Sequence, residues 1–247
     1  SENSKYNSHT RESKNCYMNS LTYRGEDVCY SYWIAYAKDI IDSFMCNNST
    51  LCYECLDGDH LYNCVGLQEC YNCNDCHFSY QLRRCENCIG CWDLVGKNYH
   101  ICNQAVSKED FEAFKKQLLN GNYESLEQGW ELFKQAYKSA KHRATYNLQC
   151  ENVVGNHLIG CKNSYYSFDG QNNEDCSYNI NASDSKDVHL SHSCGWGPSE
   201  LVYQSGVTRS SQNIAYSYYT FLSSNLRYCD SSMNLKNSFG CISLKKQ

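Results

Sequence analysis

Residues 16–55 read, in blocks of twelve, CYMNSLTYRGED, VCYSYWIAYAKD, IIDSFMCNNSTL and CYEC. Each block opens with a small or apolar anchor residue, in turn Cys16, Val28, Ile40 and Cys52. Three positions later stands a small polar residue or a cysteine, in turn Asn19, Ser31, Ser43 and Cys55. An Asn or Asp often precedes the anchor, as at Asn15, Asp27 and Asp39. The chain therefore repeats with a short, fixed period.

The repeat extends through most of the 247 residues. In the first half the anchors continue at Leu61, Cys70, Cys76 and Cys85, at intervals of 9, 9, 6 and 9 that are all multiples of three. After residue 146 a second series has its anchors at Cys150, Leu158, Ser164, Cys176, Val188, Leu201, Ile214, Leu226 and Ser238. Three residues after these anchors, only Val153 breaks the rule of a small polar residue or cysteine; Ser191 and Gln204 follow it. The two series are one motif used twice.

A period of twelve does not fit a helical heptad. Runs rich in Tyr and β-branched residues, such as 28–34 and 213–219, indicate short strands, and the chain has a single proline. We therefore predict a mainly β fold, a parallel β-solenoid of ~12-residue repeats in two series, whose coils stack at about 4.8 Å. Like residues stacked in register would replace a conventional apolar core.

The segment between the two series has a different character. It lacks cysteine, places an N-cap at Ser107, and spaces Phe111, Phe114 and Leu118 as one face of a helix. After Asn120-Gly121-Asn122, a second helix carries Leu126, Trp130, Phe133 and Tyr137. We predict a helical hairpin that caps an end of the solenoid or covers an edge strand. The expected domains are a first series at 1–106, the hairpin at 107–145 and a second series at 146–247.

Composition limits the classes of partner. The chain has 22 Lys+Arg against 27 Asp+Glu, a net charge of −5, which is unsuited to binding phosphate backbones, so we expect no nucleic-acid partner. No apolar run is long enough to span a bilayer, and no membrane contact is expected. No signal peptide is visible and the cysteine count, 19, is odd, both of which favour a cytoplasmic location.

One stretch resembles a known group of sequences. Residues 85–103, CENCIGCWDLVGKNYHICN, followed by SKEDF at 107–111, are similar to the Asn-Cys-x-Gly-Cys-x-x-Leu-x-x-Lys-x-Tyr segment of cysteine-rich repeat proteins from candidate phyla radiation bacterial metagenomes. Residues 237–247 resemble a second, interrupted copy. The resemblance covers nearly the whole chain and implies no assigned activity. Family members usually begin with Cys-x2-Cys zinc-ribbon segments that are missing here, and we expect the chain to be a fragment.

The cysteines allow three interpretations. The densest groups, Cys-x2-Cys-x2-Cys, comprise Cys70, Cys73, Cys76, Cys85, Cys88 and Cys91, and such spacing can hold zinc or an iron–sulfur cluster. Disulfides between coils are a second interpretation. We favour a third, a ladder of free thiols without any cofactor, because these cysteines occupy columns that Ser, Asn and Val fill elsewhere. A metal ligand would not be replaced by serine from one repeat to the next.

Histidines and carboxylates add further candidates. His77 or His100 can complete a Cys/His zinc site, although an exposed polar position is the simpler expectation, and His189, His192 and Cys194 form another loose group. The chain has none of the common nucleophile, phosphate-loop or zinc-protease motifs. Asp57, Asp59 and Asp75 are the carboxylates considered for a carbohydrate-active β-helix. We expect no enzyme activity.

The expected function is therefore structural or interactive. Tyrosines recur beside the anchors, at Tyr17, Tyr30, Tyr32, Tyr53, Tyr62, Tyr71, Tyr165, Tyr178, Tyr203, Tyr216, Tyr218 and Tyr228. Because side chains alternate along a strand, half of these are expected to point inward and the others to form an outer face. That face would bind a protein or a carbohydrate. The sequence leaves the oligomeric state open.

Overall fold

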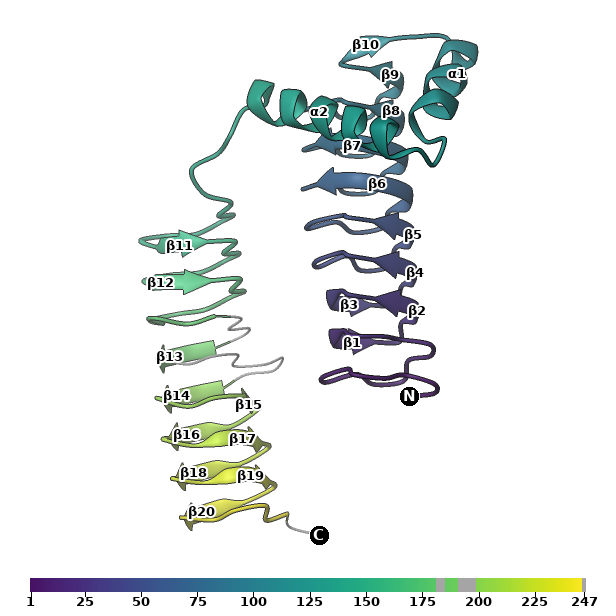
Figure 1. Ribbon diagram of the computed structural model, residues 1–247. Helices are drawn as coiled ribbons and strands as arrows, with labels where there is room; N and C mark the ends of the chain where they lie inside the picture. Colours follow the sequence, from purple (N-terminus) through teal and green to yellow (C-terminus); the bar gives the residue numbers. More distant parts are fainter. Residues whose placement is uncertain (181–184, 191–198, 246–247) are drawn as a thin grey trace. The chain divides into compact units, whose positions relative to one another are not determined.

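The computed structural model describes residues 1–180, 185–190 and 199–245. The chain divides into two compact units, Ser1–His142 and Arg143–Gln247, and each contains a parallel β-solenoid (Figure 1). The first unit also contains both helices. No helix in the described ranges has the length and apolar character needed to cross a bilayer.

The elements are short. The first unit comprises β1 Ser20–Tyr23, β2 Glu26–Cys29, β3 Tyr32–Ala35, β4 Lys38–Ile41, β5 Thr50–Tyr53, β6 Tyr62–Gln68, β7 Asn74–Tyr80, β8 Glu86–Ile89, β9 Asn98–Ile101, β10 Gln104–Ala105, α1 Lys108–Leu118 and α2 Tyr123–Ser139. The second comprises β11 Val154–Asn156, β12 Tyr165–Phe168, β13 Ser185–His189, β14 Ser199–Tyr203, β15 Thr208–Arg209, β16 Gln212–Ala215, β17 Tyr218–Phe221, β18 Ser224–Arg227, β19 Asp230–Met233 and β20 Lys236–Phe239.

The predicted stacking is confirmed. Strand β2 pairs in parallel with β4, and β4 with β5, so that Val28, Ile40 and Cys52 are neighbours in adjacent coils. The pairing of β5 with β6 adds Cys64 to the same file, by which we mean a column of residues stacked one coil apart. These pairs advance by twelve residues per coil. The largest sheet runs β10-β9-β8-β7-β6-β5-β4-β2 and is parallel except for its last pair, β10 with β9.

The interior repeats every three residues. From Ser13 to Cys91, each third residue is buried, which places four inward side chains in each coil of twelve. This corrects the meaning of the shorter anchor intervals, because Leu61 follows Ser49 in one file and Leu82 follows Cys70 in another, both twelve residues apart. The intervals of 9 and 6 therefore compare different files of coils that all have the same length.

In the first unit, a left-handed backbone residue precedes each inward residue from Ser13 to Cys91 and turns the chain. Examples are Asn15, Asp27, Asp39 and Leu51, whose φ angles are 52°, 53°, 55° and 56°. This geometry costs an ordinary residue about 1–2 kcal/mol, least for Asn, Asp and Gly and most for β-branched residues. No left-handed residue in the described chain is Val, Ile or Thr. The Asn and Asp residues before the anchors are thus the turn positions of the coil.

The second unit shows the same plan with irregular coils. Val202, Ile214, Leu226 and Ser238 stack in successive strands. The predicted anchor Leu201 is wrong by one position, because Leu201 is the exposed left-handed residue and Val202 is the buried one. Gln204 is exposed for the same reason, and Ser205 takes the inward place. Coil length is eleven where Val154 pairs with Tyr165 and fourteen where Val188 pairs with Val202. Ser191 lies outside the described residues.

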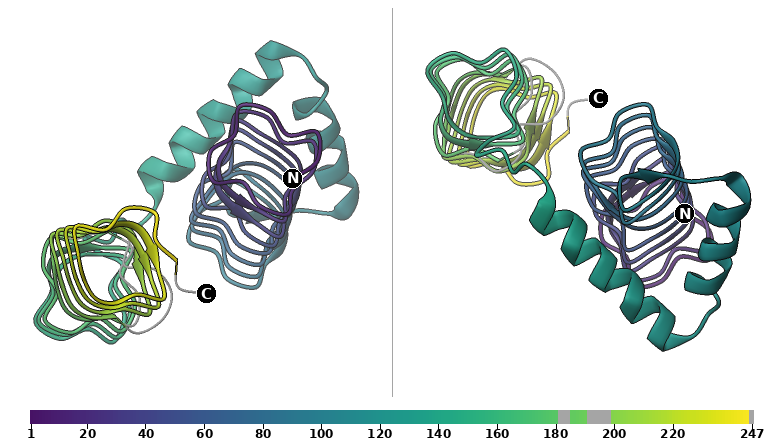
Figure 2. Two further views of the ribbon diagram at one scale, coloured as in Figure 1. Left: turned by 90° about the horizontal axis from the view of Figure 1, so that it is seen from below. Right: turned by 90° about the horizontal axis from the view of Figure 1, so that it is seen from above.

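The helical hairpin forms as predicted and packs on the last coils of the first solenoid. Ser107 caps α1 by accepting a hydrogen bond from the Asp110 amide. Helix α2 packs chiefly on β7, a central strand, where the Trp130 and Phe78 ring centroids lie 5.5 Å apart. Gly129 permits this approach, because a Cβ there would lie 2.3 Å from the Phe78 ring. Helix α1 contacts β9, the neighbour of the edge strand β10, so the hairpin covers one side of the last coils of the first solenoid, as the views along the stack show (Figure 2).

A substitution at one turn position tests the backbone rule. Replacing exposed, left-handed Leu51 by Val should destabilise the fold by about 1–2 kcal/mol, because a β-branched side chain clashes in this conformation. Thr50→Val, one residue earlier on strand β5, should change stability by less than about 0.5 kcal/mol. Urea unfolding of both variants makes the comparison. Equal effects at the two positions would contradict the left-handed geometry.

Candidate functional site: a thiol-lined interior and an exposed aromatic row

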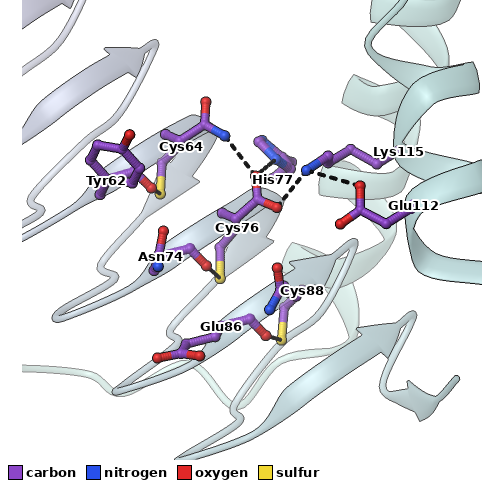
Figure 3. A network of polar contacts seen from close by, with 12 residues as sticks. Tyr62, Cys64, Asn74, Cys76, His77, Glu86, Cys88, Glu112 and Lys115 are labelled. Carbon is purple, nitrogen blue, oxygen red and sulfur yellow. Dashed lines mark hydrogen bonds and ion pairs between the residues drawn. The ribbon is translucent and has the colours of Figure 1, made fainter. Parts of the chain in front are cut away.

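The six cysteines of the two dense clusters all lie inside the first solenoid. Cys70, Cys73, Cys76, Cys85, Cys88 and Cys91 are each no more than 1% exposed. Within one cluster the three side chains enter the interior from successive sides of the coil, because each is three residues from the next. Cys64, Cys76 and Cys88 lie one above another on β6, β7 and β8 (Figure 3). All cysteines of the described chain are free thiols.

The thiols make the same hydrogen bonds as the serines they replace. Ser43 Oγ donates to the Ile41 carbonyl at 2.9 Å and accepts the Cys55 amide at 3.2 Å, twelve residues on. Cys70 Sγ likewise donates to the Gln68 carbonyl at 3.3 Å and accepts the Leu82 amide at 3.4 Å. Interior Ser and Cys are therefore interchangeable in bonding, and both satisfy buried backbone groups that would otherwise be costly.

The thiols also contact one another. Nine of them form a set that we call the thiol network: Cys52, Cys55, Cys64, Cys70, Cys73, Cys76, Cys85, Cys88 and Cys91. Cys52 lies beside Cys55 and Cys64, and Cys73 beside Cys70 and Cys76, within one packed core. Cys88 lies beside Cys76, Cys85 and Cys91. Each of these three thiols is a hub between coil sides or between coils.

Burial and these contacts set the acidity of the thiols. Burial raises the pKa of Cys46, beside the network, to about 12 and raises the pKa of Cys70 well above its usual range. Hydrogen bonds from the Cys70 and Cys76 thiols lower the pKa of Cys73, which makes Cys73 the thiolate most readily formed in its coil. Among the described residues, no group of three or more Cys, His, Asp or Glu side chains is arranged to hold a metal ion.

His77 is placed differently from the simple expectation. The imidazole is fully buried rather than exposed, on the outer side of β7 beneath the hairpin. Its Nε2 lies 3.1 Å from Asp75 Oδ1, and its Nδ1 has no hydrogen-bond partner. Lys115 of α1 donates to Asp75 Oδ2 at 2.6 Å, and Asn63 donates to Asp75 Oδ1 at 2.7 Å (Figure 3). His77 thus belongs to a polar link between solenoid and hairpin, on the opposite side of the strand from Cys76.

The other histidines are also separated from the expected partners. His100 pairs with Cys88 across β8 and β9, and its Nδ1 bonds the Asn98 carbonyl at 2.9 Å as interior Ser and Cys do. It therefore extends the file of Cys64, Cys76 and Cys88 instead of meeting Cys102. His189 is exposed on β13. His192, Cys194 and the segment 195–198 lie outside the described residues.

The hydrogen bonds around Asp75 make the hairpin contact pH-dependent. Burial opposes ionisation of Asp75, but the bonds from His77 and Lys115 outweigh it and lower the pKa below the ordinary 3.8. A carboxylate with a lowered folded-state pKa contributes stability above its unfolded-state pKa. That contribution is lost as the pH falls through the lower, folded-state value.

Asp75→Asn tests this link, because Asn tolerates the left-handed backbone at this position and still accepts a hydrogen bond. We expect a loss of about 1–3 kcal/mol at neutral pH and a faster tryptic cleavage at Lys115. The variant should lose less stability than the wild type as the pH is lowered from 5 to 2. Asp39→Asn, at another left-handed position, serves as the control. Identical acid profiles for wild type and Asp75→Asn would refute the assignment.

The tyrosines do not divide between inside and outside. All twelve that recur beside the anchors lie on the outer surface, and the expectation that half point inward is wrong. The reason is the three-residue period: the inward position takes small or aliphatic residues, and both remaining positions of each side face outward. In the described chain the buried tyrosine is Tyr80, which the hairpin covers at Tyr137 and His142.

The longest set of exposed rings in contact, among the described residues, is on the second unit. We call Tyr203, Tyr216, Tyr228 and Phe239 the aromatic row. Successive ring centroids are 5.6, 5.0 and 5.4 Å apart, and every ring is at least 42% exposed. Tyr203 and Phe239 are the last residues of β14 and β20, and Tyr216 and Tyr228 directly follow β16 and β18 of the same sheet. On the same sheet, side-chain amides of Asn213, Asn225 and Asn237 bond one another in a parallel row.

The first unit also has exposed aromatic side chains, which surround a groove. Tyr6, Met18, Tyr30 and Tyr32 flank a groove of about 570 Å³ whose floor is Asn7, Asn19 and Ser31. Tyr17 joins two of these rings, with centroids 5.7 Å from Tyr6 and 5.6 Å from Tyr30. Arg24 lies over the rings of Tyr23 and Tyr36 on another side of the coil. Aromatic side chains therefore cluster on the outside of both units.

Comparisons with known proteins leave the family open. No protein-family model matches the chain, and no curated protein matches it. Among solved structures, a putative acetyltransferase from Desulfovibrio desulfuricans G20 is 10% identical, with a TM-score of 0.16 over 97% of this chain and 66% of that one. An Arabidopsis UDP-N-acetylglucosamine acyltransferase is 8% identical, with a TM-score of 0.11 over 89% of this chain and 61% of that one. The chain thus spans less than two thirds of the length of either structure.

Proposed function

We propose that this protein is a non-enzymatic scaffold whose aromatic row binds a protein partner. The observation that carries the proposal is the row itself, four touching rings on successive coils, each at least 42% exposed. Exposed apolar groups gathered in one place mark interaction surfaces more often than scattered ones do. Tyrosine is among the residues enriched at protein interfaces, because its ring is apolar and its hydroxyl bonds polar groups.

The ring orientations favour a protein over a sugar. Tyr216 and Tyr228 stack on each other with an interplanar angle of 6°, so the faces between them are already covered. Tyr203 and Phe239 then stand edge-on to their neighbours, at 88° and 68°. A sugar ring stacks on an open aromatic face, whereas ring edges, hydroxyls and the adjacent amide row suit the backbone and side chains of a polypeptide. The carbohydrate alternative is therefore the second outcome of the test.

Several features support a role without catalysis. The thiols of the thiol network are buried and bonded to backbone carbonyls, which suits a structural use. Of the carboxylates considered for glycoside cleavage, Asp75 is paired with Lys115 and His77, and Asp59 accepts a hydrogen bond from Asn48. The net charge of −5 supports a protein partner over a nucleic acid.

The experiment replaces the rings and follows one identified partner. A photo-cross-linking amino acid at Tyr216 identifies the protein that contacts this surface in cells. The variant Tyr203→Ser, Tyr216→Ser, Tyr228→Ser should then bind the purified partner at least tenfold more weakly, about 1.4 kcal/mol or more. The control variant changes three exposed tyrosines outside the row, Tyr62, Tyr123 and Tyr178, to Ser and should bind normally.

Two results would count against the proposal. If the row variant and the control variant bind the partner equally, the row is not the contact surface. If the wild type binds a glycan array and the row variant does not, while no protein is cross-linked, the carbohydrate alternative replaces the present one.

A further inference from the structure

The thiol network has a chemistry that the surface function does not use. Nine thiols lie within the coils between Cys52 and Cys91, and each is no more than 3% exposed. Serine makes the same backbone hydrogen bonds elsewhere in the interior, as Ser43 and Ser79 do. The fold alone therefore does not require sulfur at so many neighbouring positions. What sulfur adds is affinity for soft metal ions.

The contacts favour an ion that needs few ligands. Thiols of the network stack in register one coil apart, as Cys52 with Cys64 and Cys76 with Cys88 do, and no group of three or more ligating side chains in the described residues is arranged to hold a metal ion. Zinc prefers four ligands in a tetrahedron. Among the metals that thiolates select, Cu(I) is the soft monovalent ion, and two thiolates are enough to bind it. We propose that the thiol network binds Cu(I) between pairs of neighbouring cysteines.

The binding step is balanced by release of protons. One Cu(I) ion and two thiols give a linear S–Cu–S unit of charge −1, and two protons leave to solvent. A single buried charge of this kind is unfavourable. The three hubs reduce the cost, because a thiolate of Cys52, Cys73 or Cys88 has two or more thiol neighbours and can bridge two copper ions. A chain of n copper ions linked through n + 1 thiolates keeps a single charge of −1, so each further ion adds one thiolate, releases one proton and adds no charge, and loading should therefore be cooperative.

Entry requires the coils to open, since the thiols are closed off from solvent. Local opening of short strands supplies such access. Uptake by the folded, reduced protein should therefore be slow, and refolding in the presence of Cu(I) should give the loaded form quickly. Both routes are used in the test, so that slow entry of Cu(I) is not mistaken for a lack of binding.

The test compares two triple variants of equal size. Cys52→Ser, Cys73→Ser, Cys88→Ser removes the hubs and with them all seven thiol–thiol contacts of the network. Cys55→Ser, Cys70→Ser, Cys91→Ser removes three equally buried thiols but keeps four of those contacts. Each protein is titrated anaerobically with Cu(I) against a chromogenic chelator, and circular dichroism checks that both variants are folded.

We expect the hub variant to lose at least nine tenths of the chelator-resistant copper and the other variant to keep more than half. Equal losses of about a third in both variants would mean that the thiols act independently and would overturn the proposal. So would the absence of chelator-resistant copper in the wild type after both loading routes. X-ray absorption of the loaded wild type should show two sulfur ligands per copper, and oxygen or nitrogen ligands would contradict the assignment without recourse to variants.

Discussion

The fold depends on one constraint: every third residue must enter a narrow coil. The position before it takes a left-handed backbone, and the inward side chain must be small or must satisfy a buried amide of the next coil. Serine, cysteine and asparagine meet the second requirement through bonds of one pattern, seen at Ser43, Cys70 and Asn19. Asn and Asp meet the first at little cost. Stacked hydrogen bonds thus replace much of the apolar burial that stabilises ordinary domains.

The same constraint places different side chains inside and outside the coil. Because the interior accepts few bulky groups, tyrosines are placed outside, where coils twelve residues apart bring their rings into contact, as in the aromatic row. Because the interior favours small groups, cysteines can accumulate there at neighbouring positions. An exposed aromatic row and a buried thiol network are therefore two results of one periodicity.

The sequence predicts the period because an anchor residue recurs in every repeat. Val28, Ile40 and Cys52 share a file as predicted, and the Ser107 cap fixed the start of α1. The orientation of the tyrosines was not readable, since the alternation of ordinary strands does not apply to three-residue sides.

The predictions that His77 is exposed and that Leu201 is an anchor were wrong for other reasons. The hairpin buries His77 through contacts with residues distant in sequence, such as Lys115, and no local pattern reveals them. The coil between Val188 and Val202 has fourteen residues instead of twelve, so a count from the regular period places the anchor before Val202, at Leu201. Most contacts of the thiol network join cysteines of different files. Spacing in the sequence predicts which cysteines share a file, but not which cysteines of different files are neighbours.

Distances between spin labels test the stacked coil most directly. Labels carried by noncanonical amino acids at residues 21 and 81 are separated by five coils on one side of the first solenoid, and labels at 21 and 69 by four. The structure predicts backbone separations of about 24 Å and about 19 Å, one strand spacing of ~4.8 Å for each twelve residues. Separations that do not grow by this step from one pair to the other would contradict the account.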